Sequence, residues 1–321
     1  MPIIDVITED SGLAALWPAW QRLWRRAPAA WPFVSPAWLQ PWWQAFGTGR
    51  PVVAIAHDNG ELLGVLPLYR LEDKLLPIGV GISDYFDVLL TPDLPADTAA
   101  ALLASALEAG DTSRCDLPEL PPDATLLHTQ APPRWHNQSW ASSVCPVLPL
   151  PPKPAIPKGM HRDLRQARHR ADRTGTWRIE RADAANLPVL LTALFALHSS
   201  RWQARGEVGV LSDPRVRGFH STAAPELLNA GLLRLEAVRL ADEIAAVSYA
   251  LLASDRIAFY LSAFNPKFSF QSPGTLLLGH SLEQAFREDR QEAHLLRGGE
   301  AYKYAWGATD RFNTGRSFIR A

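Results

Sequence analysis

A proline-rich segment near the middle of the chain restricts the fold more than any other feature of the sequence. Residues 144–157 read VCPVLPLPPKPAIP. They cannot form an α-helix, because each proline lacks a backbone N–H and its ring clashes with the preceding turn. We expect an extended linker over residues 146–157, between an N-terminal module at 1–145 and a C-terminal module at 158–321.

The halves on either side of this segment repeat one order of elements. In the first half, Asn59 and Gly60 separate two apolar runs, and this dipeptide is a strong hairpin signal. In the second half, residues 233–240 alternate between apolar and polar side chains, and another apolar run follows a short turn. Helical material precedes each hairpin, and a strand, a helix (98–109 or 273–287) and a short strand follow it. The repeated order predicts a duplicated α/β module.

The composition is that of a globular protein, with 47% hydrophobic and 20% charged residues. The length of 321 residues is enough for two domains of ordinary size. A net charge of −1 argues against a protein that binds nucleic acid with its whole surface. The two cysteines fit neither a metal site nor a disulfide framework, as is usual in a reducing cytoplasm.

No segment of the sequence indicates a leader peptide or a membrane span. The N-terminus lacks a basic region followed by an apolar run, and no apolar run approaches the roughly 20 residues of a membrane helix. Motifs of zinc proteases, serine hydrolases and P-loop or dinucleotide-binding proteins are also missing. We therefore expect a cytoplasmic protein without membrane insertion and without a metal site.

The start of the helix at 273–287 has the features of an anion-binding site. Ser272 suits the N-cap, Pro273 suits the first helical position, and Gly274 leaves room for a ligand. The N–H groups of the first turn and the positive end of the helix dipole point the same way. The first module enters its helix through Asp93 and Asp97, which repel phosphate. A phosphorylated cofactor is thus expected in the second module, the alternative being an ordinary capped helix.

A basic segment at 158–173 is the strongest charge feature. Besides Lys158 it carries five arginines, at positions 162, 165, 168, 170 and 173, against only Asp163 and Asp172. One interpretation is phosphate capture, from coenzyme A, a nucleotide-linked sugar or tRNA; the other is a solvated helix. Because the run lacks interleaved aromatic residues, a small phosphorylated ligand ranks above nucleic acid.

Several short motifs follow one another along nearly the whole chain. They are FVSPAW at 33–38 with Trp42 and Trp43, GVLPLY at 64–69, DYFD at 84–87, the basic helix at 161–175, LHSSRW at 197–202, residues 264–274, and LLRGGEAYKYAWG at 295–307. Their order resembles that of the GNAT superfamily of N-acetyltransferases. More specifically, the chain is similar to the cellulose-biosynthesis-associated (CelD/BcsL-like) acetyltransferases with duplicated GNAT modules, relatives of the Fem-type aminoacyl transferases.

The resemblance implies an α/β fold of two tandem GNAT-like modules, each a mixed, mostly antiparallel sheet flanked by helices. The first module would be degenerate and on the acceptor side, and the second would bind acetyl-CoA or another acyl-CoA. The thioester would lie between two splayed strands, at 257–262 and 293–297. The pyrophosphate would rest on Gln271, Ser272, Pro273, Gly274, Thr275 and Leu276. Leu276 departs from the superfamily pattern, which has Gly or Ala there.

Under this resemblance, catalytic roles fall to three side chains. Glu300 would accept the proton of the attacking amine, and Tyr302 would protonate the departing thiolate. His198 extends an apolar helical stripe and would be a base or a pocket wall, since histidine titrates near neutral pH. The alternatives are a rim salt bridge for the first two and a core-edge histidine for the third.

Six further side chains are predicted to bind substrate. Lys303 suits a phosphate or a carboxylate, and Arg201 an anionic group. Asp84 and Asp87 suit a cationic or amino acceptor, with solvated turn carboxylates as the alternative. Trp202 and Tyr260 complete the set. The expected acceptor is an amine or hydroxyl of a small molecule or saccharide precursor. The rival functions are aminoacyl transfer from charged tRNA and a non-catalytic scaffold.

Overall fold

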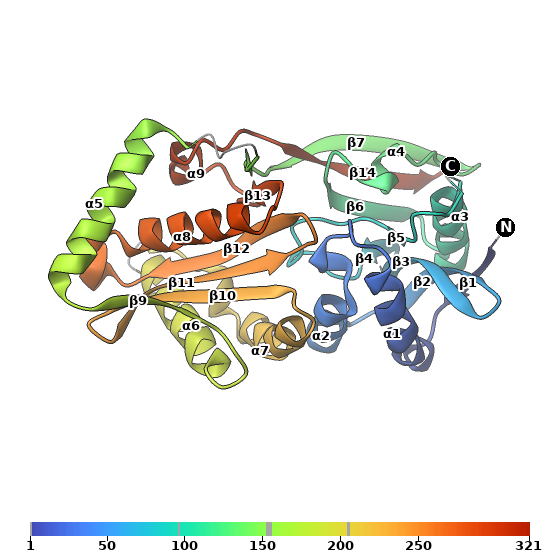
Figure 1. Ribbon diagram of the computed structural model, residues 1–321. Coiled ribbons are helices and arrows are strands. Elements are labelled where there is room, and N and C mark those ends of the chain that lie inside the picture. The colour runs from blue at the N-terminus through green and yellow to red at the C-terminus, as the bar shows by residue number, and fades with distance from the viewer. Residues whose placement is uncertain (1, 96, 152–155, 204–205) are drawn as a thin grey trace. The chain divides into compact units, whose positions relative to one another are not determined.

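The computed structural model describes residues 2–95, 97–151, 156–203 and 206–321 (Figure 1). The chain forms two compact units: Met1–Val144 together with Arg311–Ala321, and Cys145–Asp310. Each unit is a sheet flanked by helices, which confirms the predicted mixed α/β fold.

The first unit is built on an eight-stranded sheet in the order β1-β2-β3-β4-β6-β14-β7, with β5 paired to β3. Of the neighbouring strands, only β4 and β6 run parallel in the described part of this sheet. Its strands are β1 Ile3–Ile7, β2 Arg50–Asp58, β3 Glu61–Leu71, β4 Lys74–Pro77, β5 Leu89–Leu90, β6 Arg114–Leu120, β7 Trp135–Val144 and β14 Phe312–Arg320. Its helices are α1 Asp10–Arg25, α2 Pro36–Phe46, α3 Thr98–Gly110 and α4 Thr125–His128, with a 3-10 turn η1 at Pro32–Val34.

Tryptophan side chains dominate the packing of α1 and α2. Trp20 and Trp38 are fully buried, and each indole N–H has an acceptor. Trp20 donates to the carbonyl of Val34 at 3.2 Å, and Trp38 donates to the hydroxyl of Ser83 at 2.9 Å. These two rings thus fill the core with their own N–H groups satisfied, whereas the buried indole N–H of Trp42 has no partner among the described residues.

The second unit is built on a six-stranded sheet in the order β8-β13-β12-β11-β10-β9. Its strands are β8 Val147–Pro149, β9 Trp177–Arg181, β10 Leu233–Leu240, β11 Glu243–Leu252, β12 Arg256–Phe264 and β13 Glu292–His294. Its helices are α5 Lys158–Thr174, α6 Leu187–Gln203, α7 Pro214–Asn229, α8 Pro273–Arg287 and α9 Ala301–Ala305, with 3-10 turns η2 Val210–Ser212 and η3 Pro266–Gln271.

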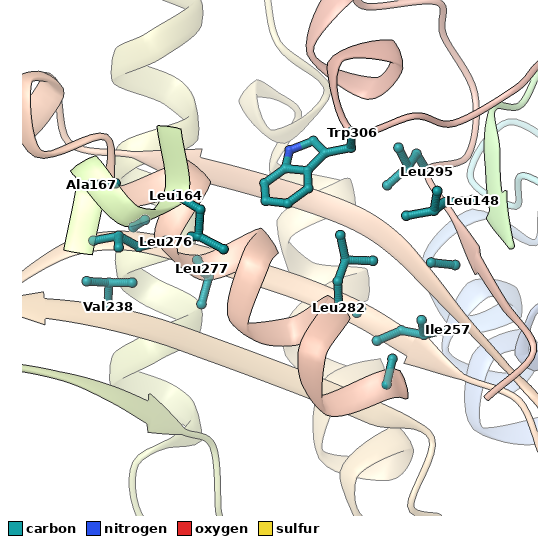
Figure 2. Packing of buried hydrophobic residues seen from close by; sticks show 14 of the residues in the cluster. Leu148, Leu164, Ala167, Val238, Ile257, Leu276, Leu277, Leu282, Leu295 and Trp306 are labelled. Carbon is teal, nitrogen blue, oxygen red and sulfur yellow. The ribbon is translucent and has the colours of Figure 1, made fainter. Parts of the chain in front are cut away.

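Helices cover both faces of this sheet. On one face, α8 lies along the strands and α5 packs on α8 (Figure 1). Figure 2 shows the apolar cluster that joins them, in which Leu164 of α5, Leu276 of α8 and Trp306 meet Val238 and Ile257 of the strands. On the other face, α6 and α7 lie against β10, β11 and β12.

The last strand departs from the expected module boundary. β14 lies in the sheet of the first unit, between β6 and β7, although the second module was expected to run from 158 to 321. Part of the expected linker 146–157 also forms β8, which pairs with β13 in the second unit. Residues 152–155 of that linker lie outside the described residues. The first sheet is therefore completed by a strand from the C-terminal end of the chain, whereas the second unit is one continuous run of sequence that includes β8.

Removal of residues 311–321 is predicted to unfold the first unit and to spare the second. β14 pairs with β6 on one edge and β7 on the other, and Phe318 is fully buried. Hydrogen exchange followed by mass spectrometry should show rapid exchange in β6 and β7 of the truncated protein. Exchange in β10, β11 and β12 should be unchanged.

The matched control is Phe312→Ser, which alters an exposed side chain of the same strand. It should leave exchange in both sheets as in the parent. Protection of β7 in the truncated protein would show that β14 is dispensable for the first sheet.

Candidate functional site

The parallel strands β12 and β13 pair over only a short stretch. Residues 256–258 of β12 pair with residues 292–294 of β13, after which β13 ends and β12 continues to Phe264. In the described part of the chain, no other strand pairs with this edge of β12. On this edge of β12, the backbone N–H and C=O groups beyond residue 258 are therefore not used by strand pairing. Splayed strands were expected at 257–262 and 293–297; the second strand is shorter than expected, because β13 ends at His294.

A bulge lies within this open stretch of β12. Leu261 pairs with Tyr249 and Phe259 pairs with Ala250, so Tyr260 is the additional residue. The ring of Tyr260 lies 6.0 Å from that of Tyr249 and 5.6 Å from that of His220. The bulge thus places Tyr260 among side chains on the face that α6 and α7 cover.

The start of α8 leaves two backbone amides without an acceptor in the helix. Leu276 N–H donates to the carbonyl of Ser272 at 3.2 Å, whereas Gly274 and Thr275 precede the first intrahelical bond. A Cβ placed on Gly274 would meet no heavy atom within 4 Å. The space beside Gly274 is open, so no neighbouring atom crowds this part of the helix start.

Two expectations for this helix start need correction. Ser272 has left-handed backbone angles (φ 52°, ψ 55°), and its side chain makes no capping hydrogen bond. The amide of Leu276 is used within the helix, and its side chain is 2% exposed in the apolar cluster. The part of the predicted pyrophosphate loop that remains open is therefore Gly274 and Thr275.

The end of the basic helix α5 lies beside this helix start. Arg170 donates to the carbonyl of Phe270 at 3.0 Å, and its guanidinium lies 4.7 Å from the centre of the Phe270 ring. Gln271 Nε2 donates to the hydroxyl of Thr174 at 3.1 Å, while its buried Oε1 has no partner among the described residues. Arg168, in contrast, pairs with Glu283 at 2.7 Å. α5 thus brings one fixed cation to the edge of the candidate phosphate site.

His198 is a neutral, buried side chain. It is 4% exposed, and its Nε2 accepts a hydrogen bond of 2.9 Å from the indole of Trp202. Burial, with a smaller effect of the Arg201 charge, lowers the pKa of His198 to about 4. The lone pair of Nε2 is occupied by the Trp202 N–H, so neutral His198 has no free nitrogen that could accept a proton. Of the two expected roles, base or pocket wall, this geometry disfavours that of a general base.

Glu300 and Tyr302 lie within electrostatic reach of Arg201, which also packs over the ring of Phe264 at 5.8 Å. Desolvation opposes ionisation of Glu300, but the hydrogen bond and charge of Lys303 and the charge of Arg201 lower its pKa overall. Loss of water around the hydroxyl, and then the charge of Glu300, raise the pKa of Tyr302 to about 12. The structure thus gathers an ionised carboxylate and a protonated phenol near the end of β12.

Lys303 has a structural role instead of the expected ligand-binding one. It is 2% exposed, and its Nζ donates to the carbonyls of Leu296, Arg297 and Gly298 at 3.0, 2.8 and 2.9 Å. Glu300 Oε2 lies 2.9 Å from the same nitrogen. An ammonium has only three N–H groups, so none remains for a phosphate or a carboxylate. Lys303 anchors the turn that follows β13.

Asp84 and Asp87 also have structural positions, in the first unit. The Asp87 carboxylate accepts N–H groups from Val88, Thr125 and Leu126 at 2.8, 2.7 and 3.0 Å, so it caps the start of α4. Burial raises the pKa of Asp87 to about 6 against the effect of these bonds. Asp84 is 6% exposed. Asp84 is thus buried, and the half-buried Asp87 carboxylate is engaged by three backbone amides, which disfavours the predicted amine-binding role.

Two residues of the site were missed in the sequence. His220 of α7 and Tyr249 of β11 are buried, with ring centres 5.5 Å apart, and both contact the bulged Tyr260. Each lies in a regular element among apolar residues, where sequence alone indicates core packing. The sequence therefore offers no signal that would have singled out these two residues.

The described residues contain no group of three or more histidine, cysteine, aspartate or glutamate side chains placed to hold a metal ion. Among the described helices, none combines the length and the apolar character needed to cross a membrane.

Residues 158–304 match the model of the acetyltransferase (GNAT) domain. Three solved structures, each 11% identical, are similar to most of the chain. They are a conserved protein of unknown function from Bacteroides thetaiotaomicron (TM-score 0.63, 100% of both chains), the C-terminal domain of a proposed lysylphosphatidylglycerol synthetase from Agrobacterium fabrum (0.61, 95% of this chain and 91% of that chain) and FemX (0.61, 89% and 91%). No curated protein significantly matches the sequence.

At this level of identity the three structures show only that the fold is shared, and nothing about activity follows from them. The domain match covers the strands and helices that form the split between β12 and β13 and the start of α8. Residues 158–304, which lie within the second unit, are therefore similar to the acetyltransferase (GNAT) domain, and the solved structures support a shared fold.

Proposed function

We propose that the second unit transfers an acyl group from acyl-CoA, with acetyl-CoA as the simplest donor, to an amine or hydroxyl. The observation that carries this proposal is the separation of β12 and β13 next to the open start of α8. The thioester would lie along the open edge of β12. The pyrophosphate would accept the N–H groups of Gly274 and Thr275, with Arg170 nearby.

The reaction needs no group beyond those present and the two substrates. The acceptor nitrogen forms a bond to the thioester carbon, and the carbon–sulfur bond breaks. A backbone N–H on the open edge of β12 would stabilise the oxyanion. Glu300, ionised at neutral pH, would take the proton of the amine, and Tyr302, which keeps its proton, would give one to the thiolate. Positioning of both substrates supplies much of the remaining rate.

A second candidate donor is aminoacyl-tRNA. The basic face of α5 favours it, because His161, Arg162, Arg165, His169 and Arg173 are all exposed. FemX and L-PGS from Bacillus licheniformis, the latter with a TM-score of 0.56 at 12% identity, share the fold. We rank this donor second, since the open amides of α8 suit a pyrophosphate. The saccharide acceptor and the link to cellulose biosynthesis remain part of the proposal, as does a cytoplasmic location.

Calorimetric titration with acetyl-CoA tests the donor site. The parent is expected to bind, and Gly274→Glu is expected to bind at least roughly tenfold more weakly, because a carboxylate beside the first turn repels the pyrophosphate. Gly218→Glu is the matched control, since Gly218 lies in the exposed part of α7 and its Cβ would also meet open space.

Two outcomes would contradict the acyl-CoA assignment: a parent that binds no acyl-CoA, and a Gly274→Glu variant that binds as well as the parent. In the first case, salt-sensitive binding of charged tRNA that is lost in the Arg162→Ala/Arg165→Ala/Arg173→Ala variant would favour the second candidate. Binding of neither donor would favour a non-catalytic scaffold.

Tyr302→Phe is predicted to lower kcat by about 100-fold without changing the affinity for acetyl-CoA, because it removes only the proton donor to the thiolate. Release of the coenzyme A thiol, followed with an acceptor found by screening, measures this. Tyr304→Phe, on the same short helix and 38% exposed, is the control and should keep parental kcat. Equal kcat for the two variants would remove Tyr302 from the mechanism.

A further inference from the structure

A cluster of neutral polar side chains lies between the sheet of the second unit and helices α6 and α7. It consists of His198, His220, Tyr249 and Tyr260. The His220 ring lies 5.5 Å from that of Tyr249 and 5.6 Å from that of Tyr260. His198 and His220 influence each other electrostatically. Through Tyr260 the cluster reaches the bulge in the open stretch of β12, where the reacting carbonyl is proposed to lie.

The hydrogen bond from Trp202 fixes the tautomer of His198. An indole N–H can only donate, so the Nε2 that it contacts at 2.9 Å must carry a lone pair. Neutral His198 then holds its proton on Nδ1. That atom is buried and has no partner among the described residues. His198 thus presents an N–H donor whose acceptor is not supplied by the described part of the protein.

Tyr249 adds a second unsatisfied group. Its side chain is fully buried in the middle of the sheet, and its hydroxyl also lacks a partner among the described residues. Folded proteins rarely bury such groups without a reason, because each has lost its bonds to water. Two of them beside one ring cluster indicate a ligand that completes their hydrogen bonds.

The cluster carries no charge at neutral pH. Burial lowers the pKa of His198 to about 4 and that of His220 to about 3, and it raises the pKa of Tyr249. The charge that acts on His198 belongs to Arg201, which also acts on the carboxylate of Glu300. An ion placed among these rings would lose its hydration and gain no counterion from the cluster.

We propose that His198 Nδ1–H and the Tyr249 hydroxyl bind an uncharged polar group of the acceptor, such as an amide carbonyl or a hydroxyl. The site would therefore select a neutral portion of the acceptor over a carboxylate or an ammonium group. This proposal rests on the acyltransferase function in one respect only, namely that the ligand is the acceptor.

The stability of Tyr249→Phe separates a ligand-binding role from a structural one. The substitution removes only a buried hydroxyl without a partner, so the melting temperature of the ligand-free protein should not fall. Tyr69→Phe, in the first unit, is the control for loss of a tyrosine hydroxyl. A fall of several degrees in Tyr249→Phe alone would mean that the hydroxyl is bonded within the protein, which would overturn the proposal.

Binding of three matched fragments tests the selectivity. Benzamide, benzoate and benzylamine share a ring and differ in charge. Benzamide should shift the NMR signal of the Trp202 indole N–H, which is assigned by its absence in Trp202→Phe. The ionised fragments should shift it only at concentrations at least roughly tenfold higher. Tyr249→Phe should weaken the binding of benzamide by about fivefold to tenfold, and Tyr69→Phe should leave this binding unchanged.

Equal binding of the charged fragments, or benzamide binding that survives in Tyr249→Phe, would overturn the proposal. So would a nitrogen-15 spectrum in which His198 carries its proton on Nε2. These measurements need no acyl donor and should give the same result in Gly274→Glu. A failed fragment test beside intact acetyl-CoA binding would therefore reject the acceptor pocket alone.

Discussion

The short pairing of β12 with β13 is the constraint on which the rest of the second unit depends. Two parallel strands that pair over three residues each and then part must be held from their outer sides. β12 is held by β11 along its length, and β13 is held by β8. Lys303 fixes the turn after β13 by bonding three successive carbonyls. Each of the two strands is thus held from its outer side, and the turn after β13 is held by Lys303.

Buried polar groups in this unit divide into two kinds with different consequences. Lys303 is an ammonium taken out of water, and the fold compensates it with an acceptor for every N–H. His198 and Tyr249 are neutral groups that the described protein leaves uncompensated. The first kind stabilises the turn after β13, and the second is where we propose that a ligand binds. The same distinction applies in the first unit, where Asp87 is fully occupied by the three amides that it caps.

Local signals in the sequence predicted the elements well. The Asn59-Gly60 turn gave the β2–β3 hairpin, and the Ser-Pro-Gly-Thr run gave the start of α8, because turn and helix-start preferences depend on neighbouring residues. The position of β14 was not predictable in this way, since its partners β6 and β7 precede the whole second unit in sequence. Burial was also invisible: Lys303 was predicted to bind a ligand, but it is buried and donates to three backbone carbonyls. The left-handed conformation of Ser272 had no signal, because such angles usually mark glycine.

The central claim is that a donor binds along the open edge of β12 and at the start of α8. Hydrogen exchange with and without acetyl-CoA tests it most directly, because both sites consist of backbone amides. Slower exchange at residues 259–264 and at Gly274 and Thr275, with no change in the β2–β3 hairpin of the first unit, is the predicted result. Unchanged exchange in both segments at a saturating concentration of acetyl-CoA would contradict the account.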